Sequence, residues 1–74
     1  MARDITTAQE LGAVLRAARK ARGLRLEDVA LGAGVGVRFL SELERGKETA
    51  RLGEMLRVID TLGLELSVED PDGE

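Results

Sequence analysis

Cysteine, histidine, tryptophan and tyrosine are absent from this chain of 74 residues, and phenylalanine occurs once. Without cysteine, no disulfide or cysteine-ligated zinc site can stabilise the fold. Without histidine, the commonest metal ligand and general base is missing. A single aromatic residue, Phe39, cannot form a platform on which bases stack, and we expect it in the core. These absences predict that the chain holds no metal and no cofactor.

Long apolar runs are missing as well. No segment approaches the ~20 residues of a membrane-spanning helix. The first ten residues are polar, unlike a secretory signal. We therefore expect a cytoplasmic protein with no membrane partner. Because so short a domain buries only about 60% of its unfolded surface, self-association is the expected source of further stability.

Groups arranged for catalysis are not evident either. Gly32, Gly34 and Gly36 do not form a phosphate-binding loop, because no strand precedes them and no Gly-Lys-Ser/Thr follows. No pair of carboxylates has a spacing that indicates a site. We predict that the protein is not an enzyme.

Charge is divided unevenly along the chain. Residues 1–47 carry nine Lys and Arg against six Asp and Glu, whereas residues 48–74 carry two against eight. The formal net charge of −3 therefore combines a basic part with an acidic part. This division indicates two different partners; uneven scatter over a solvated surface is the alternative.

Apolar periodicity predicts four helices. Thr7 and Glu10 form a capping-box pattern before the first, which runs to about residue 22. The others cover about 26–32, 37–45 and 50–62, the last with Thr49 as its N-cap. Residues 1–6 are expected to be a flexible arm and 70–74 a disordered acidic tail. The residues predicted to face inward are Leu11, Val14, Leu15, Ala18, Leu26, Val29, Ala30, Ala33, Leu40, Leu43, Leu52, Met55, Leu56, Ile59 and Leu62.

Residues 26–45 have the pattern of a helix-turn-helix. Ala33, Gly34 and Val35 separate two short helices, and Gly46 ends the second. In such a unit the second helix enters the major groove of DNA, which is wide enough to admit it.

The periodicity changes after residue 63. Leu64, Leu66 and Val68 alternate with polar residues, which is the period of a half-buried strand. A lone strand leaves its backbone amides and carbonyls unpaired, and the same strand of a second copy can pair with it about a two-fold axis. Residues 64–69 therefore predict a homodimer; a coil or a frayed helix end is the alternative.

Together these segments resemble the Xre class of helix-turn-helix repressors, the lambda-repressor-like fold, over residues 7 to about 62. Segments 11–24, 33–35 and 40–47 carry the resemblance, and segment 61–68 is similar to the HipB-type antitoxins. The resemblance implies an all-α bundle of four to five helices over residues 7–63, with one C-terminal β-strand paired across a homodimer. It also implies a repressor of its own operon, bound to a palindromic DNA operator, with a HipA-like kinase toxin as partner.

Other functions fit the same pattern. The chain would be a stand-alone Xre-type regulator if no toxin partner exists. It would be a toxin-neutralising module with weak DNA binding if the acidic C-terminal part is its main working surface. A controller protein of a restriction-modification system shares the fold, but such controllers usually dimerise through a further helix, and the predicted strand argues against one.

By position in the family, Val37, Arg38 and Glu42 would meet base edges. A guanidinium can donate two hydrogen bonds to guanine, and valine can contact a thymine methyl group. Glu42 would accept from cytosine or hold Arg38 one turn away. A phosphate contact or a solvated charge is the alternative for Arg38.

Four further cations are candidates for the DNA backbone: Arg16, Arg25, Arg45 and Lys47. Contacts to phosphate supply affinity without sequence information. Ordinary surface charge is the alternative for each.

The resemblance also implies a structural salt bridge between Arg19 and Glu44. Three positions depart from the family pattern. Arg25 and Leu26 replace the usual Thr-Gln, whose Gln holds a phosphate, and leucine cannot make that hydrogen bond. Gly36 replaces the serine that often caps the recognition helix, at a cost of a few tenths of a kcal/mol.

Overall fold

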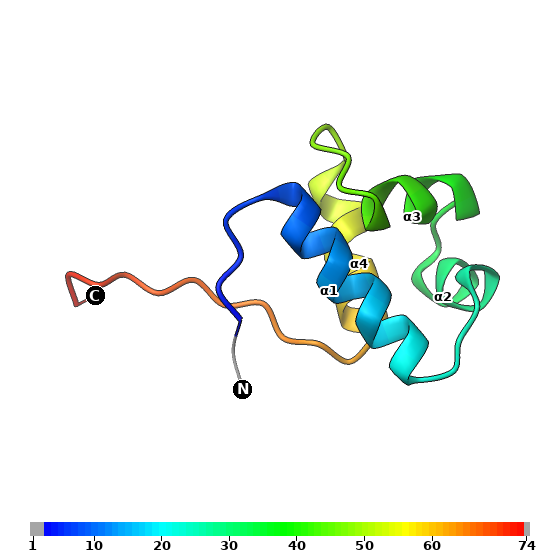
Figure 1. Ribbon diagram of the computed structural model, residues 1–74, viewed down its shortest axis with the longest axis horizontal. Coiled ribbons are helices and arrows are strands. Elements are labelled where there is room, and N and C mark those ends of the chain that lie inside the picture. The colour runs from blue at the N-terminus through cyan, green and yellow to red at the C-terminus, as the bar shows by residue number, and fades with distance from the viewer. Residues whose placement is uncertain (1–2, 74) are drawn as a thin grey trace.

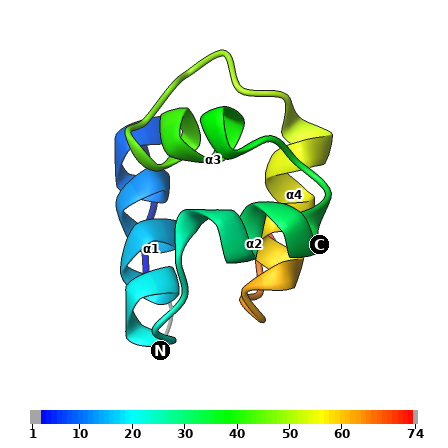
Figure 2. The same cartoon turned by 90° about the vertical axis from the view of Figure 1, so that its right-hand side faces the viewer.

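Four helices form the protein in the computed structural model, which describes residues 3–73: α1 (Ala8–Ala21), α2 (Leu26–Ala33), α3 (Val37–Glu44) and α4 (Leu52–Thr61). α3 packs on α1 and α2, and α2 also packs on α4. Figure 2 shows α1 and α4 on two sides of the bundle, with α2 and α3 between them. The predicted all-α helix-turn-helix bundle is confirmed.

The predicted capping box begins α1. The Thr7 hydroxyl accepts a hydrogen bond from the Glu10 amide at 3.0 Å, and the Glu10 carboxylate accepts from the amides of Thr7 at 3.2 Å and Thr6 at 2.6 Å. These bonds satisfy amides that no helical carbonyl can reach. The hydrogen bond from the Thr6 amide is the largest cause that lowers the pKa of Glu10.

The core is formed by apolar side chains from all four helices. Ten hydrophobic residues are buried, and Leu15, Val29, Leu40 and Val58 are the largest that are fully enclosed. Phe39 is half-buried against this core, as expected of the single aromatic residue. The ten are Leu15, Ala18, Val29, Ala30, Ala33, Leu40, Leu43, Val58, Ile59 and Leu62.

The start of α4 differs from the prediction. Arg51, not Thr49, is the N-cap, and the helix begins two residues later than expected. Ala50 packs against the core from the preceding loop instead of beginning the helix. Leu52 and Leu56, predicted to face inward, lie one turn apart and are 63% and 42% exposed. The reason is that Met55, Val58, Ile59 and Leu62 already fill the inner face of this short helix.

A left-handed residue makes the turn between α2 and α3. Gly34 has φ +71°, a conformation that glycine adopts without steric cost. The Val35 amide then donates to the Ala30 carbonyl at 3.0 Å, which closes the helix end. Gly36 has extended backbone angles and caps α3 without a side-chain hydrogen bond.

The strand predicted over residues 64–69 does not form in the single chain, where residues 64–70 have no regular secondary structure. A strand needs a neighbour for its backbone groups, and one chain supplies none here. Leu64 remains half-buried on the core, whereas Leu66 is 51% and Val68 93% exposed. In Figure 1 this tail leaves the helices at the end of the molecule opposite α2 and α3.

The predicted arm and tail lie partly outside the described residues, which exclude residues 1, 2 and 74. Within the described part, residues 3–6 are exposed and have no regular secondary structure. None of the four helices is long and apolar enough to cross a membrane. Residues 3–73 also contain no cluster of acidic side chains able to hold a metal ion.

Candidate nucleic-acid interface

The outer face of α3 carries the residues predicted to read bases. Leu40 and Leu43 fix the inner face because both are buried in the core. The first turn therefore presents Val37, which is 43% exposed, and Arg38, whose side chain is 91% exposed. An exposed apolar side chain beside an exposed guanidinium suits a groove that offers methyl groups and acceptors.

Glu42 lies between two cations on this face. Its carboxylate accepts from Lys47 Nζ at 3.0 Å and from Arg38 Nε at 3.4 Å. The hydrogen bond from Lys47 is the largest cause that lowers the pKa of Glu42, with a smaller contribution from Arg38. Glu42 therefore stays ionised and restrains both cations. Arg45 and Lys47 line the same shallow depression as Glu42 at the end of α3.

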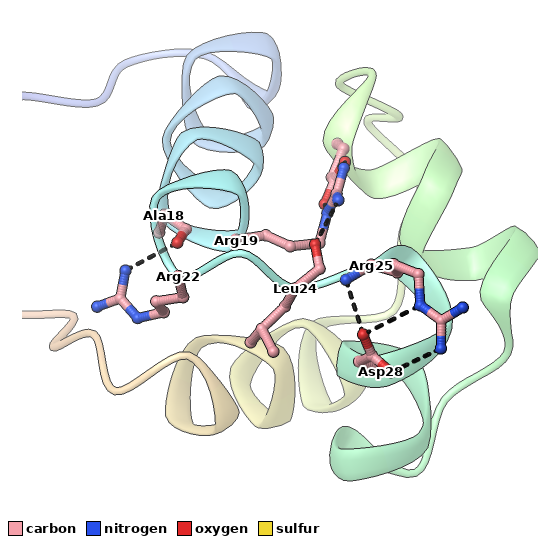
Figure 3. Close-up of polar contacts among 7 residues, drawn as sticks. Ala18, Arg19, Arg22, Leu24, Arg25 and Asp28 are labelled. Atoms are coloured by element: carbon pink, nitrogen blue, oxygen red, sulfur yellow. Dashed lines mark hydrogen bonds and ion pairs between the residues drawn. The ribbon is translucent and has the colours of Figure 1, made fainter.

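The predicted phosphate contacts come from separate places in the fold. Arg16 is exposed on α1, Arg25 precedes α2, and Arg45 and Lys47 follow α3. Figure 3 shows Arg25 turned toward Asp28, to which it donates at 3.4 and 3.5 Å. The backbone amide of Arg25 also donates to Asp28, at 2.9 Å, and this bond is the largest cause that lowers the pKa of Asp28. Both the backbone amide and the guanidinium of Arg25 are therefore hydrogen-bonded to a carboxylate in the first turn of α2.

A buried ion pair holds the C-terminal end of α3 on α1. Arg19 Nε and Nη2 donate to the two carboxylate oxygens of Glu44 at 2.7 and 3.0 Å. A third bond runs from Arg19 Nη1 to the Leu24 carbonyl at 3.0 Å, and Figure 3 shows Arg19 extending from α1 toward Leu24. The side chains are only 10% and 5% exposed. The bond to Glu44 is the largest cause that raises the pKa of Arg19, so the guanidinium stays protonated.

Gly12 allows α1 and α3 to approach closely at this same end. A β-carbon on Gly12 would lie 2.5 Å from the Leu43 carbonyl oxygen and 2.6 Å from that of Glu44. Any larger residue would push the helices apart. This contact is not among the sequence predictions, although a glycine within a helical pattern is the signal for such close packing.

Arg57 of α4 is a second residue that is not among the sequence predictions. Its Nε donates to the Ala33 carbonyl at 3.1 Å and its Nη2 to the Gly34 carbonyl at 3.4 Å, both at the turn before α3. The only sequence signal was its place beside the apolar face of the predicted helix. Nothing local indicates that it would reach a turn more than twenty residues earlier.

Two short helices joined by a tight turn, with the second presenting an exposed cationic face, define the class of helix-turn-helix DNA-binding domains. A model of the helix-turn-helix family matches residues 15–68, which is more than half of the chain. The chain therefore belongs to the helix-turn-helix family, and it is a DNA-binding transcriptional regulator of the Xre type rather than an enzyme.

Two proteins are similar to this chain, one in sequence and one in structure. An HTH-type transcriptional regulator of Sinorhizobium fredii, y4mF, is 44% identical over 71 residues, covering 96% of this chain and 93% of the relative. The restriction-modification controller protein C.AhdI from Aeromonas hydrophila is similar with a TM-score of 0.71 and 29% identity, over 78% of this chain and 88% of its own.

A chain of the HipA-HipB-O2-O3 complex has the same fold. Its TM-score is 0.86 at 17% sequence identity, over 95% of this chain and 99% of the other. The likeness extends past α4 into the C-terminal segment, because it covers almost the whole of both chains.

Proposed function

We propose that the protein is a homodimeric, sequence-specific repressor whose α3 helices enter successive major grooves of a palindromic operator. The observation that carries the proposal is the exposure of Val37 and Arg38 on the first turn of α3, while Leu40 and Leu43 fix the opposite face in the core. This arrangement leaves the N-terminal half of the recognition helix open to base edges.

Arg38, Val37 and Glu42 would read bases, and Arg16, Arg25, Arg45 and Lys47 would contact phosphate. Arg38 would leave Glu42 and donate two hydrogen bonds to a guanine. Lys47 would remain near Glu42 and offset its repulsion of phosphate. Arg25 and Lys47 would each divide their charge between a phosphate and the carboxylate already paired with them, Asp28 and Glu42 respectively.

The dimer would form through residues 64–69. Leu66 and Val68 are exposed, and the segment that carries them leaves the helices at the end of the molecule opposite α3 (Figure 1). Within residues 3–73 the backbone of this segment has no regular partner. Pairing with the twin segment would satisfy these groups and cover both side chains. Binding to successive major grooves requires that this dimer hold its two recognition helices about 34 Å apart, one turn of DNA.

We further propose that the protein is a HipB-type antitoxin that represses its own operon and binds a HipA-like kinase toxin. The similarity to a chain of the HipA-HipB-O2-O3 complex and the acidic composition of residues 48–74 support this assignment. A restriction-modification controller is less favoured, because no further helix follows α4 within residues 62–73.

Three measurements test these proposals. Footprinting upstream of the gene should reveal two symmetric half-sites, and sedimentation should give about twice the 8.0 kDa of one chain. Purification of the tagged protein with its native operon should retain a kinase-like partner. Equal binding to unrelated DNA would contradict the repressor proposal. Specific binding without a retained partner would leave a stand-alone regulator and contradict the antitoxin assignment.

A further inference from the structure

The two ends of the recognition helix are supported differently. At its C-terminal end, α1 contributes the Arg19–Glu44 ion pair and the close approach at Gly12. At its N-terminal end, Gly36 caps α3 without any side-chain hydrogen bond. The direction of the first turn of α3, where Val37 and Arg38 lie, therefore depends on the turn over residues 34–36.

That turn is contacted by Arg57. The Arg57 guanidinium donates to the carbonyls of Ala33 and Gly34 at 3.1 and 3.4 Å. Carbonyls at a helix C-terminus have no partner within the helix, and a cation there interacts favourably with the helix dipole. Arg57 therefore stabilises the C-terminal end of α2 in the geometry that leads into α3.

Arg57 is itself restrained within α4. Glu54 lies one turn earlier, 3.9 Å from Arg57 Nη2, and it also pairs with Arg51. The Glu54 side chain is only 19% exposed, so its position is set by packing. The Arg57 side chain reaches from α4 to the C-terminal end of α2, and these two helices pack on each other.

The same helix leads directly into the segment proposed to form the dimer. The Leu64 amide donates to the Ile59 carbonyl at 3.1 Å, and the Leu64 side chain packs on the core. The start of the 64–69 segment is thus fixed to α4. One helix contacts the turn before the recognition helix and also carries the dimerisation segment.

We infer that Arg57 is a positioning residue that links the dimer-forming end of the chain to the entry of the recognition helix, and so helps to set sequence specificity without touching DNA. This inference rests on the proposed function. It assigns a role to the two hydrogen bonds of Arg57 with the carbonyls of Ala33 and Gly34.

Arg57→Met tests the inference, because methionine keeps much of the aliphatic stem and removes the donors. Arg51→Met is the matched control: it removes the same charge from the N-cap of the same helix and from the same Glu54 partner, but Arg51 makes no hydrogen bond to the turn. Arg57→Lys keeps a cation but not the planar fork, so it should rescue only part of the effect.

The first measurement is hydrogen exchange of the free protein, which requires no DNA. We expect the amides of Gly34 and Val35 to exchange about five- to tenfold faster in Arg57→Met, as loss of hydrogen bonds of this kind predicts. The Leu15 amide in α1 should not change, and Arg51→Met should behave as the unaltered protein. Unchanged exchange at Gly34 and Val35 would overturn the inference.

The second measurement is the ratio of affinities for the operator and for unrelated DNA. We expect this ratio to fall about five- to tenfold in Arg57→Met while the slope of affinity against salt stays the same. A salt slope reduced by about one, with both affinities weakened equally, would make Arg57 a phosphate contact and overturn the inference. If the unaltered protein shows no operator preference, the proposed function fails, and exchange alone decides whether Arg57 holds the turn.

Discussion

The backbone of Gly12 lies against that of Leu43, so that a β-carbon on Gly12 would come within 2.5 Å of the Leu43 carbonyl oxygen. No flexible side chain is available to move aside, because the obstructing atoms belong to the backbone at the end of α3. Gly12 therefore fixes the distance between α1 and the recognition helix.

Gly12→Ala should destabilise the protein. Replacing glycine by alanine inside a helix normally stabilises it by about 1 kcal/mol. Here we expect the free energy of unfolding to fall by about 2 kcal/mol instead, because overpacking costs about 1–3 kcal/mol. Urea unfolding measures the change. Gly53→Ala in α4 is the control: no atom lies within 4 Å of its added carbon, so it should stabilise, and equal signs for the two variants would contradict the packing argument.

Removing one member of the Arg19–Glu44 pair should lower the free energy of unfolding more than removing both members does. Arg19→Met or Glu44→Leu leaves an uncompensated buried charge, with an expected loss of about 3–5 kcal/mol. The double variant should recover to within about 1 kcal/mol of the unaltered protein, because buried pairs are often replaceable by apolar residues. Urea unfolding of the four proteins forms a double-mutant cycle, and additive losses would contradict the coupling.

Arg38 and Arg45 should differ in their effects on DNA binding. Arg38→Lys keeps a cation opposite Glu42 but loses the planar fork, and we expect a loss of about 1–3 kcal/mol for the operator alone. Arg45→Ala should weaken operator and unrelated DNA alike and reduce the salt slope by about one. Titrations of each variant with operator and with unrelated DNA at several salt concentrations distinguish base reading from phosphate contact. Equal losses on both DNAs for Arg38→Lys would make Arg38 a phosphate contact.

The pKa of Glu42 should rise when Lys47 is removed. The Lys47 hydrogen bond is the largest cause that lowers this pKa, so Lys47→Ala should raise it more than Arg38→Ala does. Because the folded-state pKa is depressed, the stabilisation is present above the ordinary pKa of glutamate and is lost as pH falls through the depressed value. NMR titration of the side-chain carboxyl measures the shift. A larger rise in Arg38→Ala would reverse the assigned order of the two partners.

Leu66→Asp should convert the proposed dimer into monomers. It would place like charges near the two-fold axis of the proposed strand pair and remove apolar contact. Leu31→Asp is the matched control, because Leu31 is an equally apolar side chain, 85% exposed on α2. Sedimentation should detect monomers only for Leu66→Asp. A dimer that survives Leu66→Asp would place the subunit contact elsewhere.

The sequence predicted a helix start or a turn correctly where a single residue type determines the local conformation. The capping box at Thr7 and the left-handed Gly34 act over three or four residues, so the chain reveals them directly. The burial of Leu40 and Leu43 follows from helical spacing. The exposure of Leu52 was not predictable in this way, because it depends on which face of α4 the other helices cover.

The candidate site was predictable only in part for the same reason. Spacing places Val37, Arg38 and Glu42 on one helix, but it does not show that Lys47 also reaches Glu42. The Arg19–Glu44 contact was inferred from family resemblance alone. Arg57 joins residues distant in sequence through backbone carbonyls, which every residue possesses and which leave no mark in the sequence.

The buried Arg19–Glu44 pair has a consequence for the behaviour of the fold on heating. The hydration free energy of charged groups becomes less favourable on heating, so the desolvation cost of such a pair falls as temperature rises. The ion pair between α1 and the recognition helix would therefore lose less of its stabilising free energy on warming than contacts that depend on hydration of polar groups. We expect heat to loosen residues 64–69 before it releases α3 from α1, so the proposed dimer would dissociate before the recognition helix loses its position.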